Sequence, residues 1–361
     1  MEEKKHNNKK SERTGDERKV KLSTIIYSIL ILIAAYLIVI AILIYGFKMD
    51  NKVIRKTSQI IPYPAALINY TRVITYDELK SDLDAIKQFY TSQNFSSLGL
   101  KVDFNSVDGQ KRLEVKEKEL LNKLIENKII EMLARQRGIS ITSAMVAAQV
   151  NNKIAQYGNS DTNVLDNLKR LYGWNLNDFE NQIVKPDLYR EALSQKFRDT
   201  DQSSIAAKKK IEAAQAALKN GQNFGEVAKQ YSEGASAKNG GELGWFSANQ
   251  MLPEVAAAAF IMNKGGTSDV IESSIGYHII NIEDKRTENG ADQVKIRQIF
   301  VRTESFSDWL LAQEKNVKIF IPLKEFYWDS GTAQVKFRDQ QMTNFENNLS
   351  KNSPDDASML F

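Results

Sequence analysis

The pattern of hydrophobic and polar positions changes twice along this chain. An unbroken apolar stretch comes first, helical spacing follows, and beyond Gly241 short runs alternate as strands do. Apolar residues recur every three or four positions on a helix face and every second position on a strand face. The pattern therefore predicts an apolar helix, a helical region and a mixed region, and the expected fold class is α+β.

The apolar stretch contains no charged residue from Leu22 to Phe47. A helix of that length can cross a bilayer core of about 30 Å. A cleavable signal peptide is the main alternative, but its apolar part would be shorter and would end in small residues, whereas this stretch ends in Tyr45, Gly46 and Phe47. A buried core helix would normally show a polar face. We expect residues 22–47 to be a membrane-spanning helix in contact with the lipid bilayer.

Basic residues flank this helix unequally, with eight before it and four soon after it. This bias predicts a cytoplasmic basic tail at residues 1–21 and an extracytoplasmic remainder, so the protein is expected to be a single-pass protein of the cell membrane. The tail holds eight bases and five acids, a net +3, which leaves +1 of the chain's +4 for residues 22–361. Such a nearly neutral remainder argues against nucleic acid as a partner.

The chain contains no cysteine and two histidines, His6 and His278. The absence of cysteine excludes disulfides, thiolate metal sites and thiol catalysis. Two histidines so far apart, with His6 in the expected cytoplasmic tail, suggest no zinc site, and no phosphate-binding loop or serine triad is visible. No metal or other cofactor is expected.

Helical spacing dominates residues 66–200, after an expected juxtamembrane linker at 48–65 in which Pro62 and Pro64 discourage regular structure. A short strand or turn is expected from Ala66 to Tyr76, and Gly138 and Gly173 are expected to end helices. The apolar positions that carry the spacing are Leu121, Leu124, Ile125, Ile129, Met132, Leu133, Ala147, Val150, Ile154, Tyr157, Val164, Leu165, Leu168, Leu171, Tyr172, Leu176, Phe179 and Ile183. They predict an all-helical module.

Residues 201–303 alternate between helical and strand patterns. Two helices are expected between Ile205 and Tyr231, a strand at Leu243–Ser247, and an alanine-rich helix from Pro253 to Met262. A strand at Gly276–Glu283 would place His278, Ile280 and Ile282 on one face. Residues 304–342 suggest a helix followed by a strand or hairpin, and the polar residues 343–361 suggest a disordered tail.

Four motifs follow one another in this mixed region: the loop SEGASAKN, the turn and strand GGELGWF, the helix start QMLP and the strand GYHIINI. In this order they resemble the parvulin family of peptidyl-prolyl isomerases, over Ser232–Ile282. The segments ALINYTRVITYDELKSDL and LLNKLIENKIIEMLARQRGISIT resemble, more loosely, the chaperone domain of SurA- and PrsA-type foldases. The resemblance implies a foldase whose partners are unfolded or newly exported polypeptides with Xaa-Pro bonds; a helical spacer is the alternative for the module.

One element stands apart from the family order. A parvulin domain normally opens with a strand of the type R-H-I-L-V before its first helix, and residues 196–205 hold nothing similar. The segment VKIRQIFVRT, Val294–Thr303, has the right alternation and resembles that strand. We therefore expect a circularly permuted domain in which Val294–Arg302 inserts beside the His278 strand, as is feasible where the original termini lie close together.

The resemblance also implies the site residues. The expected polar cluster consists of His278, Ser273 and Gln298, and the expected substrate-binding cup consists of Leu243, Phe246, Met251, Val255 and Phe260. Gln298 stands where the family has a histidine, and Val255 stands where it has a phenylalanine. Gly234 stands where the family has Asp or Cys. A lone strand histidine is more often a hydrogen-bonded core residue than a catalyst, and the resemblance makes the two interpretations about even for His278. The departures favour a second interpretation, a parvulin-like chaperone or assembly platform that binds polypeptide without turnover.

Overall fold

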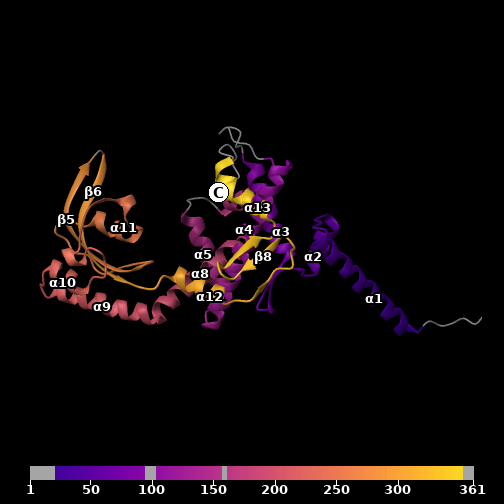
Figure 1. Ribbon diagram of the computed structural model, residues 1–361, viewed down its shortest axis with the longest axis horizontal. Helices are drawn as coiled ribbons and strands as arrows, with labels where there is room; N and C mark the ends of the chain where they lie inside the picture. Colours follow the sequence, from indigo (N-terminus) through magenta and orange to yellow (C-terminus); the bar gives the residue numbers. More distant parts are fainter. Residues whose placement is uncertain (1–20, 94–102, 157–160, 289, 353–361) are drawn as a thin grey trace, which may run out of the picture. The chain divides into compact units, whose positions relative to one another are not determined.

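The computed structural model describes residues 21–93, 103–156, 161–288 and 290–352, which fall into two units, Met1–Tyr63 and Pro64–Phe361. Figure 1 shows the helices and strands of both in the colours of the sequence. Helices combined with antiparallel sheets confirm the α+β class. The expected tail at residues 1–21 lies, except for Lys21, outside the described residues.

The first unit contains the apolar helix and a shorter helix that follows it. Helix α1 (Leu22–Ala41) continues into the π-helical turn η1 (Ile42–Gly46), and together they form a candidate membrane span of 25 residues with a mean hydropathy of 3.0. Helix α2 (Lys52–Ile60) begins after Asn51, whose side chain accepts hydrogen bonds from two backbone N–H groups. The linker expected at 48–65 is therefore partly helical, because its prolines lie beyond α2 and restrict only the residues after that helix.

In the described residues, a hairpin and helices α3 to α8 form the first part of the second unit. Strands β1 (Pro64–Ile68) and β2 (Arg72–Thr75) pair as an antiparallel hairpin, where the sequence predicted a short strand or turn at Ala66–Tyr76, so the module is not helical throughout. The helices are α3 (Tyr76–Ser92), α4 (Val107–Gln136), α5 (Ser143–Gln156), α6 (Asp161–Tyr172), α7 (Leu176–Phe179) with the π-helical turn η3 (Glu180–Val184), and α8 (Lys185–Thr200). Gly138 and Gly173 follow α4 and α6 at positive φ, as the sequence predicts.

The C-terminal segment returns to this module. It contains α12 (Phe306–Lys315), β7 (Ile319–Phe320), β8 (Phe326–Asp329), β9 (Gln334–Phe337) and α13 (Gln340–Asn352). Strand β7 pairs with β1, and Lys118 of α4 forms an ion pair with Glu346 of α13. The tail expected to be disordered from residue 343 is therefore helical to Asn352, because this helix buries Met342 and makes a long-range ion pair; residues 353–361 lie outside the described part.

A four-stranded antiparallel sheet organises the mixed region, in the order β3-β6-β5-β4. Its strands are β3 (Glu242–Ser247), β4 (Ile271–Ser273), β5 (Gly276–Glu288) and β6 (Ala291–Arg302), of which β5 and β6 form a long hairpin (Figure 1). The residues Val294–Arg302 thus lie beside the His278 strand, with His278 opposite Phe300 and Ile280 opposite Gln298. The same strand pairs with β3 on its other side.

Helices cover both faces of this sheet. Helices α9 (Gln202–Lys219) and α10 (Phe224–Tyr231) bury Ile211 and Val227 against a face that contains Ile279 and Ile299. Helix α11 (Pro253–Ile261) buries Val255 and Ala259 against the opposite face. Because alternate strand residues point to opposite faces, His278 and Gln298 belong to the α11 side, together with Ile280.

Candidate active site

A pocket of about 360 Å³ lies on the α11 side of the sheet. That volume is within the range of small-molecule and peptide sites, about 300–1,000 Å³. The pocket is lined by Gly234, Ala235, Ser236, Leu243, Phe246, Gln250, Met251, Leu252, Val255, Ile275, His278, Ile296, Gln298, Phe300 and Arg302. The elements that supply them are the loop after α10, strands β3, β5 and β6, and the start of α11.

His278 is the titratable group in the floor of this pocket. Its side chain is 2% exposed, and its ring stacks on Phe300 with the centroids 4.8 Å apart. Burial lowers the pKa of His278 from 6.5 to about 4, and the charge of Glu254 opposes the shift only in part. The imidazole is therefore neutral at pH 7.

Both nitrogens of this imidazole have hydrogen-bond partners. The Ser273 hydroxyl lies 2.7 Å from Nε2 and also donates to the Gly276 carbonyl at 3.0 Å. Since the single hydroxyl proton is used there, Nε2 carries the ring proton and donates to Ser273, while Nδ1 accepts from the Gln298 side-chain amide. The positions of the ring and hydroxyl protons are inferred from these three hydrogen bonds, which hold the imidazole in one tautomer and one orientation.

The predicted residues fall into two groups. His278 and Gln298 line the pocket, as do Leu243, Phe246, Met251 and Val255, which make an apolar cup opposite the imidazole. Ser273 lies behind the histidine, 7% exposed, and reaches the pocket only through it. Phe260 does not line this pocket; it packs in the core under α11 and faces a separate hollow beside Lys285 and Val294.

The expectation for Phe260 is corrected by helical geometry. Phe260 lies five positions after Val255, about 500° around the helix at 100° per residue, so the two side chains point about 140° apart. Val255 faces the pocket, and Phe260 therefore turns toward the β5–β6 hairpin, where the Phe260 carbonyl accepts a hydrogen bond from Lys285.

The sequence patterns did not single out Phe300 and Arg302. Phe300 contributes the aromatic ring under His278, and the Arg302 guanidinium lies 5.8 Å from that ring at the pocket edge. The pairing of β5 with β6 sets Phe300 opposite His278, so this contact depends on a strand register that one strand's pattern does not specify.

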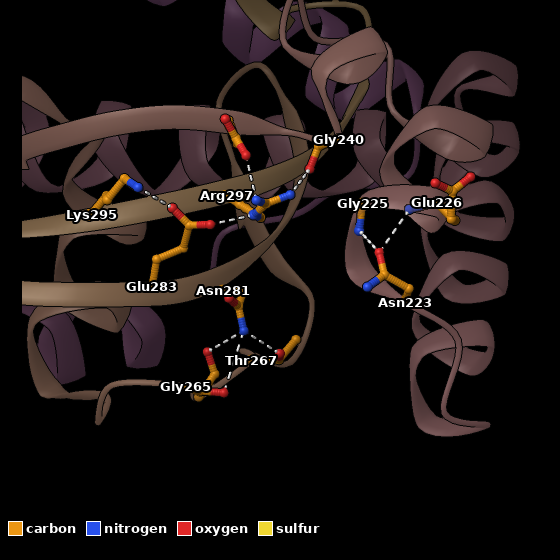
Figure 2. Close-up of polar contacts among 12 residues, drawn as sticks. Asn223, Gly225, Glu226, Gly240, Gly265, Thr267, Asn281, Glu283, Lys295 and Arg297 are labelled. Atoms are coloured by element: carbon orange, nitrogen blue, oxygen red, sulfur yellow. Dashed lines mark hydrogen bonds and ion pairs between the residues drawn. The ribbon is translucent and has the colours of Figure 1, made fainter.

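A polar cluster surrounds Arg297, the residue before Gln298 on β6; Figure 2 shows Arg297 with Glu283 and Gly240. Arg297 donates from Nε to Glu283 of β5 at 2.5 Å and forms an ion pair with Glu242 of β3. Its guanidinium also donates to the Gly240 carbonyl at 3.4 Å, in the turn before β3. One side chain thus ties three strands together on the sheet face opposite the pocket, and the same ion pairing lowers the pKa of Glu283.

The three departures from the family pattern all touch the pocket. Gly234, Val255 and Gln298 are among its lining residues. A Cβ atom added at Gly234 would meet only ordinary contacts, 3.5 Å from the Ser232 hydroxyl and 3.7 Å from Phe300. The glycine is therefore not required by the backbone, and position 234 contributes no side chain to the pocket.

Comparison with known proteins agrees with this geometry. Residues 192–284 match the family model Rotamase, the PPIC-type PPIase domain. The foldase protein PrsA 2 of Bacillus cereus is 31% identical over 229 residues, which cover 56% of this chain and 79% of that protein. The foldase protein PrsA of Bacillus subtilis is 28% identical, with 44% of this chain and 60% of that protein covered.

Two further likenesses extend the comparison. The chaperone SurA of Methylobacillus flagellatus is 35% identical over 131 residues, 35% of this chain and 30% of that protein. A crystal structure of the peptidylprolyl isomerase PrsA from Bacillus anthracis aligns at 20% identity over 64% of this chain and 96% of that chain, with a TM-score of 0.19, too low for comparing whole molecules. The Bacillus cereus relative, matched over most of its length, decides the assignment: this chain carries a parvulin-type peptidyl-prolyl isomerase domain and belongs to the PrsA family of foldases.

Proposed function

We propose that this protein is a membrane-anchored foldase that accelerates cis–trans isomerisation of Xaa-Pro bonds in exported polypeptides outside the cytoplasm. The observation that carries the proposal is the pocket over His278. Its apolar cup faces a buried, neutral and fully hydrogen-bonded imidazole. The names of the PrsA and SurA relatives, foldase and chaperone, support the same class of client.

The chemistry requires no proton transfer. Rotation about an Xaa-Pro amide breaks no covalent bond, and its barrier of about 18–20 kcal/mol reflects lost amide resonance. A pocket accelerates rotation by binding the twisted amide more tightly than the planar one, with each 1.36 kcal/mol of difference giving about tenfold in rate. Here Leu243, Phe246 and Met251 would hold the proline ring in an apolar environment, where the amide loses the water that favours its planar, polarised form.

In this scheme His278 acts on the bound amide electrostatically. Because its ring is neutral and both nitrogens are engaged, it presents a fixed, desolvated dipole rather than an acid or base. Gln298 donates to the ring through its amide nitrogen and keeps its carbonyl oxygen as an acceptor at the pocket wall. Ser273 holds the ring from behind.

A second function has its own supporting observation. Gly234, Gln298 and Val255 replace three side chains that the family places around the twisted amide, and all three positions line the pocket. A pocket that has lost polar groups but kept its apolar cup can still bind a proline-containing segment. The alternative is a foldase that binds polypeptide through this pocket and the helical module without accelerating isomerisation of its Xaa-Pro bonds.

The membrane anchor is part of the proposal. The segment Leu22–Gly46 is long and apolar enough to span a bilayer, and 6% of its most apolar window is buried within the protein. A soluble core helix would be mostly buried, so this exposure supports a span. The excess of basic residues before it supports a cytoplasmic N-terminus.

The proposal also includes a circular permutation of the isomerase domain. Two observations support it: β6 occupies a central place between β3 and β5, and the family match ends at residue 284, before β6 begins. A chain that ends at Arg286 would lose the strand that pairs with both neighbours. We expect that truncation to abolish cooperative unfolding of the isomerase domain; a truncated protein that still unfolds cooperatively in urea would contradict the permutation.

The proposed activity is tested with the full chain in detergent micelles and a series of Ala-Xaa-Pro-Phe peptides. Acceleration that is lost in His278→Ala but kept in the surface variant Lys264→Ala would support the isomerase. A parallel assay measures suppression of aggregation of a denatured client. No acceleration, from a folded sample that still suppresses aggregation, would favour the second function.

A further inference from the structure

Helix α2 has a buried side, an exposed apolar strip and an exposed polar side. Ile54, Thr57 and Ser58 are buried, whereas Val53 and Ile60 are 58% and 79% exposed. At 100° per residue, Val53 and Ile60 lie within about 20° of each other on the helix, so they form one apolar strip. The exposed polar residues Lys52, Lys56 and Gln59 lie on the other side of this strip, with the half-buried Arg55. The helix is thus amphipathic, and its apolar strip is not covered by any described part of the chain.

This helix is tied to the side of the candidate span. The Tyr36 hydroxyl lies 2.7 Å from the Thr57 hydroxyl, and the Tyr63 hydroxyl donates to the Leu37 carbonyl at 3.0 Å. Tyr36 lies ten residues before Gly46, or about 15 Å back along the helix at 1.5 Å per residue. After leaving the span the chain therefore folds back beside it.

The depth of α2 in a bilayer follows from these contacts. A hydrocarbon core of about 30 Å corresponds to about 20 helical residues, which is the length of α1. If α1 fills the core, Tyr36 lies about 8 Å inside its outer boundary, at the level of Thr57. An interfacial helix buries its apolar face about 5–10 Å into the headgroup–acyl boundary, so the depth of Thr57 fits a helix that lies at that boundary.

We infer that α2 is an interfacial helix embedded at the outer headgroup–acyl boundary of the membrane. In this arrangement Val53 and Ile60 enter the acyl region, and Lys52 and Lys56 bind the phosphates of anionic phospholipids. The exposed side chains of Phe47 and Met49, in the connection before α2, add to the lipid-facing surface. The inference rests on the proposed membrane anchor and goes beyond it, because it makes residues 47–61 a lipid-binding element rather than a spacer.

The absence of cysteine makes the test direct, since single cysteines can be labelled without removing others. The full chain is reconstituted in phosphatidylcholine vesicles with and without phosphatidylglycerol, and an environment-sensitive fluorophore is attached at Val53→Cys or Ile60→Cys. Quenching by spin-labelled lipid reports contact with acyl chains. Leu30→Cys, within α1, reports the span itself; Gln59→Cys, on the polar side of α2, and Val107→Cys, exposed on α4, are the water-facing controls.

The expected result is quenching at Val53→Cys and Ile60→Cys at least threefold above that at Gln59→Cys and Val107→Cys, and stronger with phosphatidylglycerol present. Changing Lys52 and Lys56 together to Gln should remove the phosphatidylglycerol effect. Strong quenching at Leu30→Cys with none at Val53→Cys and Ile60→Cys would overturn the interfacial helix and leave the anchor intact. No quenching at Leu30→Cys would overturn the anchor and the inference with it.

Discussion

Acidification should weaken the isomerase domain because the buried histidine resists protonation. The pKa of His278 is about 4 in the folded protein, against 6.5 without its environment, and burial is the main cause. The unfolded chain therefore binds a proton first as the pH falls. The contribution of His278 to the free energy of unfolding is fully present above pH 6.5 and decreases as the pH falls from 6.5 toward 4. Below pH 4 this group causes no further change. The full difference corresponds to about 3 kcal/mol at about 1.4 kcal/mol per pH unit.

The helical module should respond with the opposite sign. Burial raises the pKa of Asp82 and of Glu314 to about 7, with the charges of Glu78 and Glu126, respectively, adding to the effect. Lys123 beside Asp82, and Arg190 beside Glu314, oppose it. The folded module thus binds protons before the unfolded chain does, and its stability rises as the pH falls from 7 toward the ordinary carboxyl range near 4.

Hydrogen exchange resolves the two regions in one sample. At pH 5 the His278 difference alone predicts about a 20-fold loss of protection in β5 and β6 relative to pH 7, after correction for the intrinsic exchange rate. Protection in α3 and α4 should rise over the same interval. In His278→Gln the loss in β5 and β6 should disappear between pH 7 and 5. Equal protection of β5 and β6 at both pH values in the unaltered protein would refute the reasoning.

Two further predictions concern the pocket and its sheet. Restoring the family's side chains with Gly234→Asp, Gln298→His and Val255→Phe together should raise kcat/KM for a proline peptide at least tenfold, measured in the peptide assay; an unchanged value would mean that these positions do not limit turnover. Gly276→Ala should destabilise the domain by about 3 kcal/mol or more in urea unfolding, because φ is +149° and the new Cβ would lie 2.2 Å from a β6 carbonyl oxygen. The matched variant Gly265→Ala, with φ of +84° and nothing within 4 Å, should cost only about 1 kcal/mol.

Local patterns predicted much of the sheet and helices. Alternation alone placed His278, Ile280 and Ile282 on one strand face, and the described structure has Ile280 and Ile282 in one core and His278 in the adjoining pocket. Glycines at helix ends were equally informative, since Gly138 and Gly173 adopt the positive φ that other residues rarely take. These features depend on a few neighbouring residues and can be recognised without knowledge of the fold.

Features that depend on distant partners could not be predicted in this way. The β1–β7 pair joins Ile68 to Ile319, and the helix at the C-terminal end is fixed to α4 by Lys118 and Glu346. Polar composition near residue 343 pointed to disorder because it contains no sign of that ion pair. Phe260 shows the same limit within the site, since its motif position suggested the cup and its rotation about α11 directs it elsewhere.

Exchange NMR on one Ala-Xaa-Pro-Phe peptide, with a catalytic amount of the full chain, tests whether the His278 pocket accelerates cis–trans isomerisation of the Xaa-Pro bond. We expect cis and trans signals to exchange within about a second, against tens of seconds or more without protein. Met251→Ala, which shortens the apolar cup, should slow that exchange while the protein stays folded. Exchange that is no faster than in the free peptide, in a sample whose pocket signals shift when the peptide is added, would contradict catalysis and leave a pocket that only binds.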